Sequence, residues 1–266
     1  MKECFVSSHC GLGDSINMIP AIRYLLTKYD KINLTVKNIF LENIKLFYTD
    51  VLDKICLIPL HSPPLEYNEV SNLIIKYNNI DMYLGGLHFD RLGRGSSSIH
   101  NPNISVPRGF YNDMNLSFDE LYLSKKWFNY SSVVDKTILE KCKKYNIIFV
   151  HKETSTQTTS LIYKKIKDKI ELDEILIIDE GTNYYNSNSS EKFELAQYFI
   201  KKPIAYYIEI FKEAKEIYVT DSCLFCICLQ LSNLKALIKE VYLREYSPFV
   251  IKTITEIDPT FNCFKI

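Results

Sequence analysis

The sequence feature that most constrains the fold is the turn Gly11-Leu12-Gly13-Asp14. The apolar run Cys4-Phe5-Val6 before it predicts a buried strand, and residues 14–29 predict an amphipathic helix. A strand, a glycine turn, an acidic residue and a helix place backbone N–H groups and one carboxylate at the edge of an α/β sheet. The 266 residues include only 8 glycines, so this pair indicates a backbone need: a positive φ or the close approach of another group.

Strands and helices alternate along the rest of the chain. Strands are predicted at 3–8, 32–36, 54–58, 81–84, 147–150, 175–178, 217–219 and 237–243. Helices are predicted at 14–29, 40–49, 66–77, 117–129, 135–145, 160–168, 204–215 and 222–232. This alternation predicts an α/β fold with parallel sheets. The pattern restarts after a polar stretch, so we predict two Rossmann-like domains, residues 1–135 and 136–266, facing a ligand-binding cleft.

Composition excludes several classes of protein. Apolar residues make up 47% of the chain, which excludes global disorder. The 32 basic and 32 acidic residues balance, so no net positive field favours nucleic acid as a partner. The most apolar run, 223–231, is too short for a membrane span, and the first residues lack the apolar core of a signal peptide. Cysteines mostly inside apolar segments indicate reduced thiols, so we expect a cytoplasmic protein.

The glycine turn does not complete a dinucleotide-binding fingerprint. A full G-x-G-x-x-G pattern would need glycine at position 16, where Ile16 stands, so we reject an oxidoreductase. Asp14 then has two possible roles. It is either a cap of its own helix or a carboxylate that faces the cleft as a general base or substrate anchor.

The turn, followed by Ile16, Pro20 and Ile22-Arg23, resembles the opening of the ADP-heptose:lipopolysaccharide heptosyltransferase family and of related GT-B glycosyltransferases. The resemblance implies metal-independent transfer of a sugar from a nucleotide-sugar donor to a hydroxyl of a glycan or other acceptor. It makes Asp14 the catalytic base that deprotonates the acceptor. Gly11 and Gly13 then lie on the acceptor side of a hexosyl- or heptosyltransferase-like enzyme of glycan biosynthesis, which needs no cofactor besides its nucleotide-sugar substrate.

A second turn, Asp221-Ser222, follows the strand at 217–219 and opens a helix, whose N-terminus attracts anions. Asp221 as a plain helix cap is the alternative. The family resemblance implies that Asp221 and Ser222 bind the donor diphosphate. Cys223 stands where the family has glycine, and Cys226 stands where it usually has histidine. These departures keep open a non-catalytic nucleotide-sugar- or glycan-binding protein on the same scaffold, and a sugar-nucleotide epimerase-like enzyme is a further alternative.

Two more strand ends carry candidates for donor binding. Lysine and hydroxyl side chains after the strand at 147–150 suit phosphate oxygens, although a solvated polar loop is equally compatible. The position resembles the donor-phosphate loop of GT-B enzymes. Glu180, after the strand at 175–178, is placed to accept hydrogen bonds from ribose hydroxyls, whereas Asp179 and the residues after Thr182 look like a surface loop. The candidates in the first loop are His151, Lys152, Thr154 and Ser155.

Residues 88–113 predict a loop-rich, locally basic insert. Its Arg91, Arg94 and Arg108 are candidates for gripping an anionic or sugar acceptor, and a solvated connection is the alternative. No metal is expected, because no Asp-x-Asp motif occurs and no second Cys or His pair has zinc spacing. The cysteines at 223–228 are therefore predicted to be buried structural residues.

Overall fold

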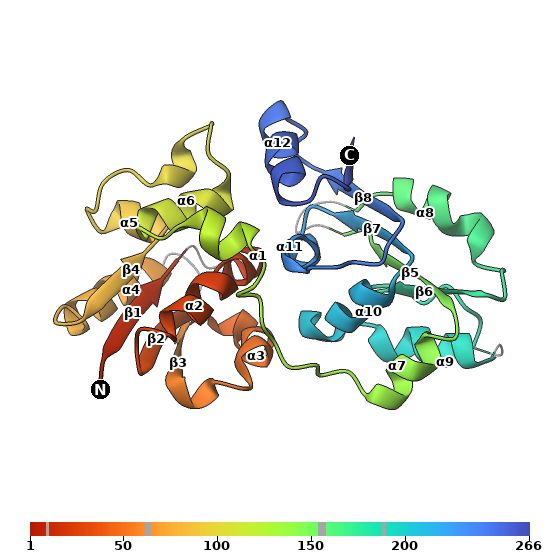
Figure 1. Ribbon diagram of the computed structural model, residues 1–266, viewed down its shortest axis with the longest axis horizontal. Coiled ribbons are helices and arrows are strands. Elements are labelled where there is room, and N and C mark those ends of the chain that lie inside the picture. The colour runs from red at the N-terminus through yellow and green to blue at the C-terminus, as the bar shows by residue number, and fades with distance from the viewer. Residues whose placement is uncertain (9–10, 62–64, 154–157, 188–189) are drawn as a thin grey trace. The chain divides into compact units, whose positions relative to one another are not determined.

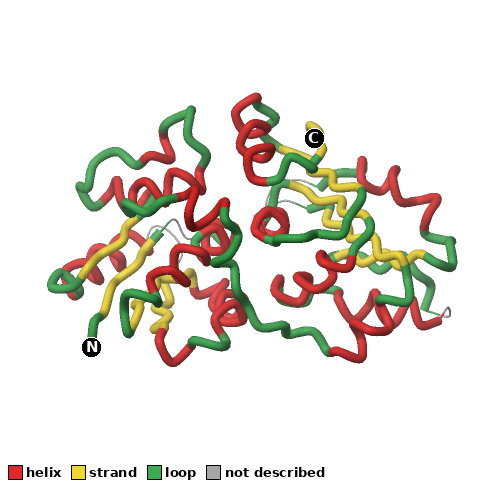
Figure 2. Tube along the Cα trace, viewed as in Figure 1, coloured by secondary structure: helices red, strands yellow, loops and turns green. Residues whose placement is uncertain are grey.

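A computed structural model describes residues 1–8, 11–61, 65–153, 158–187 and 190–266. The chain divides into two compact units, Met1–Ser131 and Ser132–Ile266. Each unit contains its own sheet, and strands alternate with helices along both units (Figure 2).

The first unit is built on a four-stranded parallel sheet. Its strands are β1 (Glu3–Ser7), β2 (Lys31–Lys37), β3 (Ile55–Leu60) and β4 (Asp81–Leu84), in the order β3-β2-β1-β4 (Figure 1). Its helices are α1 (Leu12–Asn17), α2 (Ile19–Leu25), α3 (Leu41–Lys45), α4 (Leu65–Lys76), α5 (Leu87–Arg91) and α6 (Val106–Asp113). A π-helical turn over Asp119–Leu123 follows, shorter than the helix predicted at 117–129.

The second unit is built on a five-stranded parallel sheet. Its strands are β5 (Asn146–His151), β6 (Ile175–Asp179), β7 (Glu216–Thr220), β8 (Ile238–Leu243) and β9 (Asn262–Lys265), in the order β6-β5-β7-β8-β9. Its helices are α7 (Lys136–Cys142), α8 (Leu161–Ile166), α9 (Ser190–Phe199), α10 (Ile208–Glu213), α11 (Cys223–Gln230) and α12 (Pro248–Ile257). The two parallel sheets confirm the predicted α/β class.

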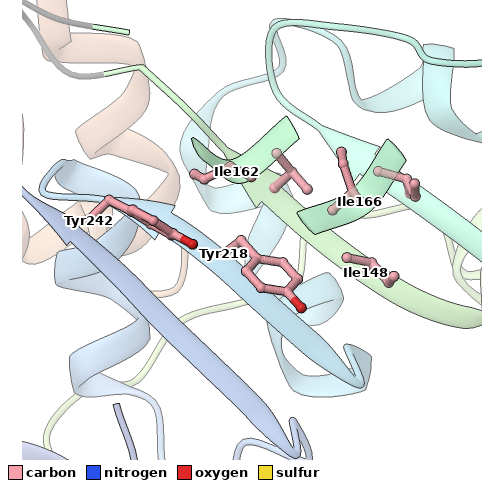
Figure 3. Close-up of a cluster of buried hydrophobic side chains, with 7 residues drawn as sticks. Ile148, Ile162, Ile166, Tyr218 and Tyr242 are labelled. Carbon is pink, nitrogen blue, oxygen red and sulfur yellow. The ribbon is translucent and has the colours of Figure 1, made fainter. Parts of the chain in front are cut away.

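The strands are rich in apolar and β-branched residues, so their side chains are buried against the covering helices. In the second unit, Ile162 and Ile166 of α8 pack with Tyr218 of β7 and Tyr242 of β8, and all four are nearly inaccessible (Figure 3). Side chains from neighbouring parallel strands thus share one apolar layer with the helix that covers them.

The helix predicted at 14–29 is divided in two. α1 ends at Asn17 and α2 begins at Ile19, with Pro20 in its first turn. Proline has no N–H to donate to the carbonyl four residues earlier, so one continuous helix is disfavoured here. Arg23 of α2 is buried and makes two bonds to the Asp50 carboxylate, at 2.7 and 2.8 Å, and one of 2.7 Å to the Phe47 carbonyl.

The insert predicted as a loop contains the helices α5 and α6. The carboxylate of Asp113, at the end of α6, accepts hydrogen bonds from the Gly86 amide at 2.9 Å and the Ser98 amide at 2.8 Å. A Cβ at Gly109 in α6 would lie 2.8 Å from the Ile99 nitrogen, so the two segments touch through backbone. The insert was predicted to be loop-rich, and α6 was missed within it; these contacts between residues distant in sequence hold α6 in place.

Besides α5 and α6, three further elements of the described residues lie where no element was predicted: α9, α12 and β9. The strand predicted at 54–58 continues as β3 through Pro59 to Leu60. β3 is an edge strand, where the missing N–H of a proline can face away from the ladder. Of the helices in the described ranges, none has the length and apolar character needed to cross a membrane.

Candidate functional site

Gly11 precedes α1 as its N-cap, and Leu12, Gly13 and Asp14 are the first residues of α1, after the carboxyl end of β1. Asp14 is the third residue of α1 and is half-buried; its Oδ2 accepts a hydrogen bond of 3.2 Å from the Gly11 amide. Gly11 has φ −66°, so it does not need a positive φ. A Cβ at this position would lie 2.5 Å from Asp14 Oδ2, so a side chain here would displace the carboxylate from the position in which it accepts from the Gly11 amide.

The junction between α1 and α2 is held by residues that the sequence did not single out. Asn17, the last residue of α1, is buried. Its carbonyl accepts from the Tyr111 hydroxyl at 3.0 Å, and its side-chain oxygen accepts from the Tyr122 hydroxyl at 2.9 Å. Both tyrosines are fully buried, so α6 and the π-helical turn support the helix that carries Asp14 and Gly13.

The three arginines predicted to grip an acceptor have three different surroundings. Arg91 is exposed and its guanidinium lies 3.2 Å from the centre of the Tyr67 ring. Arg108 pairs with Asp119 at 3.0 Å. Arg94 is exposed in the turn after α5. Their shared role toward an acceptor stays a prediction.

In the second unit, β6, β5 and β7 are neighbours, so their carboxyl ends lie side by side. His151 ends β5 and is 8% exposed; its Nδ1 lies 3.9 Å from Glu180 Oε2. Burial lowers the pKa of His151 to about 4, so the imidazole is neutral at pH 7. Burial, followed by the charges of Glu153 and Asp179, raises the pKa of Glu180.

Lys152 contacts polar side chains at and after the end of β6. Its Nζ donates to Thr182 Oγ1 at 2.6 Å and to the Tyr184 hydroxyl at 3.4 Å, and it lies 3.7 Å from Asp179 Oδ2. Asp179 also accepts from the Tyr184 hydroxyl at 2.7 Å and from the Gly181 amide at 2.8 Å.

The surface-loop interpretation of Asp179 was wrong, because its side chain is buried, with a relative exposure of 2%. Burial raises the pKa of Asp179, although the hydrogen bonds and the Lys152 charge oppose the rise. Asp179 and Tyr184 thus contact the candidate residue Lys152, and sequence reasoning missed both. The sequence signal that could have identified Asp179 is its position as an acidic residue at the end of a buried strand.

The turn after β7 contains Asp221 and Ser222. Asp221 Oδ2 lies 3.6 Å from Arg244 Nη2, and Ser222 precedes the first residue of α11. Ser222 Oγ is buried and has no hydrogen-bond partner within the described ranges. Thr220 Oγ1 donates to the Glu153 carbonyl at 2.7 Å, so the end of β7 is bonded to the segment that follows β5.

Thr154 and Ser155 lie outside the described residues. Burial raises the pKa of Cys223 to about 11, so its thiol is protonated at neutral pH. Among the residues that the structure describes, no three or more His, Cys, Asp or Glu side chains form a group that could hold a metal ion.

The fold was compared with known proteins. No protein-family model matches the sequence, and no curated protein matches it significantly. E. coli ADP-heptose LPS heptosyltransferase II matches with a TM-score of 0.55 and 12% identity, over 99% of this chain and 90% of that chain. A putative UDP-N-acetylglucosamine 2-epimerase from Listeria monocytogenes matches with a TM-score of 0.52 and 8% identity, over 98% of this chain and 84% of that chain.

A third structure is the iron-containing dodecameric glycosyltransferase TibC from enterotoxigenic E. coli. It matches with a TM-score of 0.51 and 9% identity over 93% of this chain, which spans 61% of the length of TibC. At these identities the likeness shows the fold. The chain has the architecture of GT-B glycosyltransferases, as the sequence resemblance implied.

Proposed function

We propose that the protein transfers a sugar from a nucleotide-sugar donor to a hydroxyl acceptor without a metal ion. The observation that carries the proposal is the placement of its two key turns. Asp14 follows β1 and Ser222 follows β7, each at the carboxyl end of a parallel strand, where α/β sheets bind ligands. The similarity to glycosyltransferase folds over almost the whole chain supports the same assignment.

Asp14 is the proposed catalytic base. Its Oδ2 holds the Gly11 amide, which fixes the orientation of the carboxylate. In the reaction, the carboxylate takes the proton of the acceptor hydroxyl while the hydroxyl oxygen bonds to the anomeric carbon. The bond from that carbon to the donor phosphate oxygen breaks, and the nucleoside diphosphate leaves with the electron pair.

The second unit is the proposed donor side. Ser222 Oγ and the first amides of α11 suit phosphate oxygens, because a helix N-terminus presents unpaired N–H donors. Lys152 supplies positive charge after exchanging its bond to Thr182 for a phosphate oxygen. Glu180 is proposed to accept hydrogen bonds from ribose hydroxyls.

The experiment is a thermal-shift screen with ADP-heptose, UDP-glucose and GDP-mannose, followed by measurement of released nucleoside diphosphate. We expect stabilisation by one of these and its slow hydrolysis. ADP-heptose is tested first, because a structural neighbour is named for it. Absence of any stabilisation would argue against a nucleotide-sugar protein of either kind.

A non-catalytic nucleotide-sugar-binding protein is the second candidate. The observation that favours it is the bond between Asp14 and the Gly11 amide, since this carboxylate already serves as a helix cap. Stabilisation by a nucleotide sugar without turnover, even with added acceptor glycans, supports this candidate. An epimerase is recognised by conversion of UDP-N-acetylglucosamine without release of UDP.

A further inference from the structure

We infer that His88 is a positioning residue that fixes the Ser7 hydroxyl at the end of β1, where the turn to Gly11 and Asp14 begins. The effect on turnover rests on the proposed function, whereas the effect on the turn rests on geometry alone. His88 lies in α5 and reaches Ser7 across 81 residues of sequence.

The contacts form a buried chain of hydrogen bonds. Ser7 Oγ lies 2.7 Å from His88 Nδ1, and His88 Nε2 lies 2.9 Å from Glu66 Oε1. The relative exposures of Ser7, His88 and Glu66 are 0%, 2% and 4%. Thr35 Oγ1, on the neighbouring strand β2, donates to Ser7 Oγ at 2.8 Å.

The donor and acceptor groups of these side chains set the direction of each hydrogen bond in the network. The Glu66 carboxylate only accepts, so His88 Nε2 carries the hydrogen and donates it. Ser7 Oγ accepts from Thr35, and we assign its own hydrogen to the bond with His88 Nδ1. With a hydrogen on Nε2, His88 can accept at Nδ1 from Ser7, and each side-chain polar atom of Ser7 and His88 then has a partner.

Glu66 stays ionised at the end of this chain. Burial alone would raise its pKa, but the hydrogen bond from His88 and the charge of Lys37 outweigh burial, and the pKa is lowered. Lys37 Nζ lies 3.5 Å from Glu66 Oε2, so the second carboxylate oxygen is also engaged. An ionised acceptor strengthens the bond that orients the imidazole.

The backbone at Gly85 and Gly86 aims His88 at Ser7. Gly86 has φ 61° and ψ −141°, a conformation that residues with a Cβ rarely adopt. The chain turns there from β4 into α5, which places His88 two residues later. The Gly85 amide also donates to the Ser7 carbonyl at 3.0 Å, so Ser7 is held through both its backbone and its side chain.

The serine, histidine and glutamate resemble a hydrolase triad in their bonding, but Ser7 cannot act as a nucleophile. Its exposure is 0%, so no substrate atom can approach Oγ. The network instead limits the freedom of the last residue of β1. Since Gly11 lies only four residues further, loosening Ser7 is expected to loosen the bond between the Gly11 amide and Asp14.

The test compares Ser7→Ala with Tyr29→Phe. Tyr29 is also buried in the first unit, and its hydroxyl donates to Asp81 Oδ2 at 2.6 Å and lies 3.0 Å from that of Tyr83. Asp81 begins β4, at the opposite end of the same sheet. Each substitution removes one bonded hydroxyl from the same unit, but only Ser7→Ala removes it beside the turn.

Hydrogen exchange is the readout that does not depend on activity. We expect Ser7→Ala to lower the protection of the Gly11 and α1 amides about tenfold more than Tyr29→Phe does. Equal effects of the two variants would overturn the inference. The unsubstituted protein gives a second check: ¹⁵N spectra should show His88 protonated on Nε2 and not on Nδ1, and the opposite tautomer would contradict the network.

Turnover separates positioning from general stability. With ADP-heptose hydrolysis as the assay, we expect Ser7→Ala to lower kcat about tenfold and to leave the donor KM within about twofold. Tyr29→Phe should change neither. If the unsubstituted protein has no turnover, the proposed function fails while hydrogen exchange still decides the inference.

Discussion

At the scale of single residues, the main finding is that Asp14 is both cap and candidate base. The sequence left the two roles as alternatives. The hydrogen bond from the Gly11 amide to Asp14 shows that the carboxylate does act as a helix cap. The two roles are compatible, because one carboxylate has two oxygens. They can be separated by a substitution that keeps an acceptor but removes the basicity.

Asp14→Asn is that substitution. The amide oxygen still accepts from Gly11, so we expect a stability loss of at most about 1 kcal/mol. Turnover should fall by about two to four orders of magnitude, with donor affinity unchanged. Chemical denaturation, calorimetry and product release measure the three quantities.

The control for Asp14→Asn is Asp30→Asn. The Asp30 carboxylate also accepts a backbone amide, that of Lys2 at 2.7 Å, and lies on the loop before β2. The Asp30→Asn substitution should leave turnover unchanged. Near-normal turnover in Asp14→Asn would assign Asp14 to capping alone and contradict its proposed role as the base.

His151 makes the second prediction at this scale. Its pKa falls from 6.5 to about 4 on burial, so the unfolded chain binds more protons between those pH values. His151 therefore contributes stability that is present above pH 6.5 and is lost as the pH falls toward 4. The loss is about 3 kcal/mol in free energy of unfolding.

The measurement is urea denaturation at pH 7 and pH 4.5 for the unsubstituted protein and for His151→Asn. The raised pKa values of Asp179 and Glu180 act with the opposite sign, since acidification favours their protonated folded forms. The difference between the two proteins isolates His151. An identical pH dependence in both would contradict the prediction.

At the scale of elements, local signals and long-range contacts explain which segments were predicted. The strands β1 to β8 were predicted from short apolar runs between turn residues. α6 was missed although its signals are present: Ser105 caps it by accepting from the Arg108 amide at 3.4 Å, and Pro107 lies in its first turn. The glycines and serines around it favoured a loop on composition.

Gly109→Ala tests the packing of α6. The added Cβ would lie 2.8 Å from the Ile99 backbone nitrogen, which cannot move away without shifting the turn at Ser98–His100. We expect a loss of about 1–3 kcal/mol in free energy of unfolding. Gly85→Ala is the matched control, because its Cβ would meet the end of the flexible Met114 side chain at 3.0 Å. A larger loss in the control would contradict this account.

At the scale of the whole molecule, each unit has its own parallel sheet and its own candidate residues. The donor residues predicted from the sequence all belong to the second unit, and the acceptor residues all belong to the first. This division leads to a prediction about where a nucleotide binds.

ADP or UDP should bind the second unit alone. At 100 times its dissociation constant, a ligand stabilises the folded state by about 2.7 kcal/mol. We expect hydrogen exchange to slow in peptides covering 151–153, 179–184 and 220–223, with peptides of the first unit unchanged. Lys152→Met should reduce the effect, whereas Lys165→Met, on α8, should not. Protection centred on residues 11–17 would reverse the assignment of donor and acceptor sides.

The sequence by itself determined the α/β class, most strand positions and the two turns that carry Asp14 and Ser222. These depend on apolar periodicity and on turn residues, which are local properties. Only the tertiary structure showed that Gly11 has an ordinary negative φ and lies against the Asp14 carboxylate. It also decided the partners of Lys152 and the bond of Ser7 to His88. Strand order brings such residues together from distant positions, and local patterns do not encode strand order.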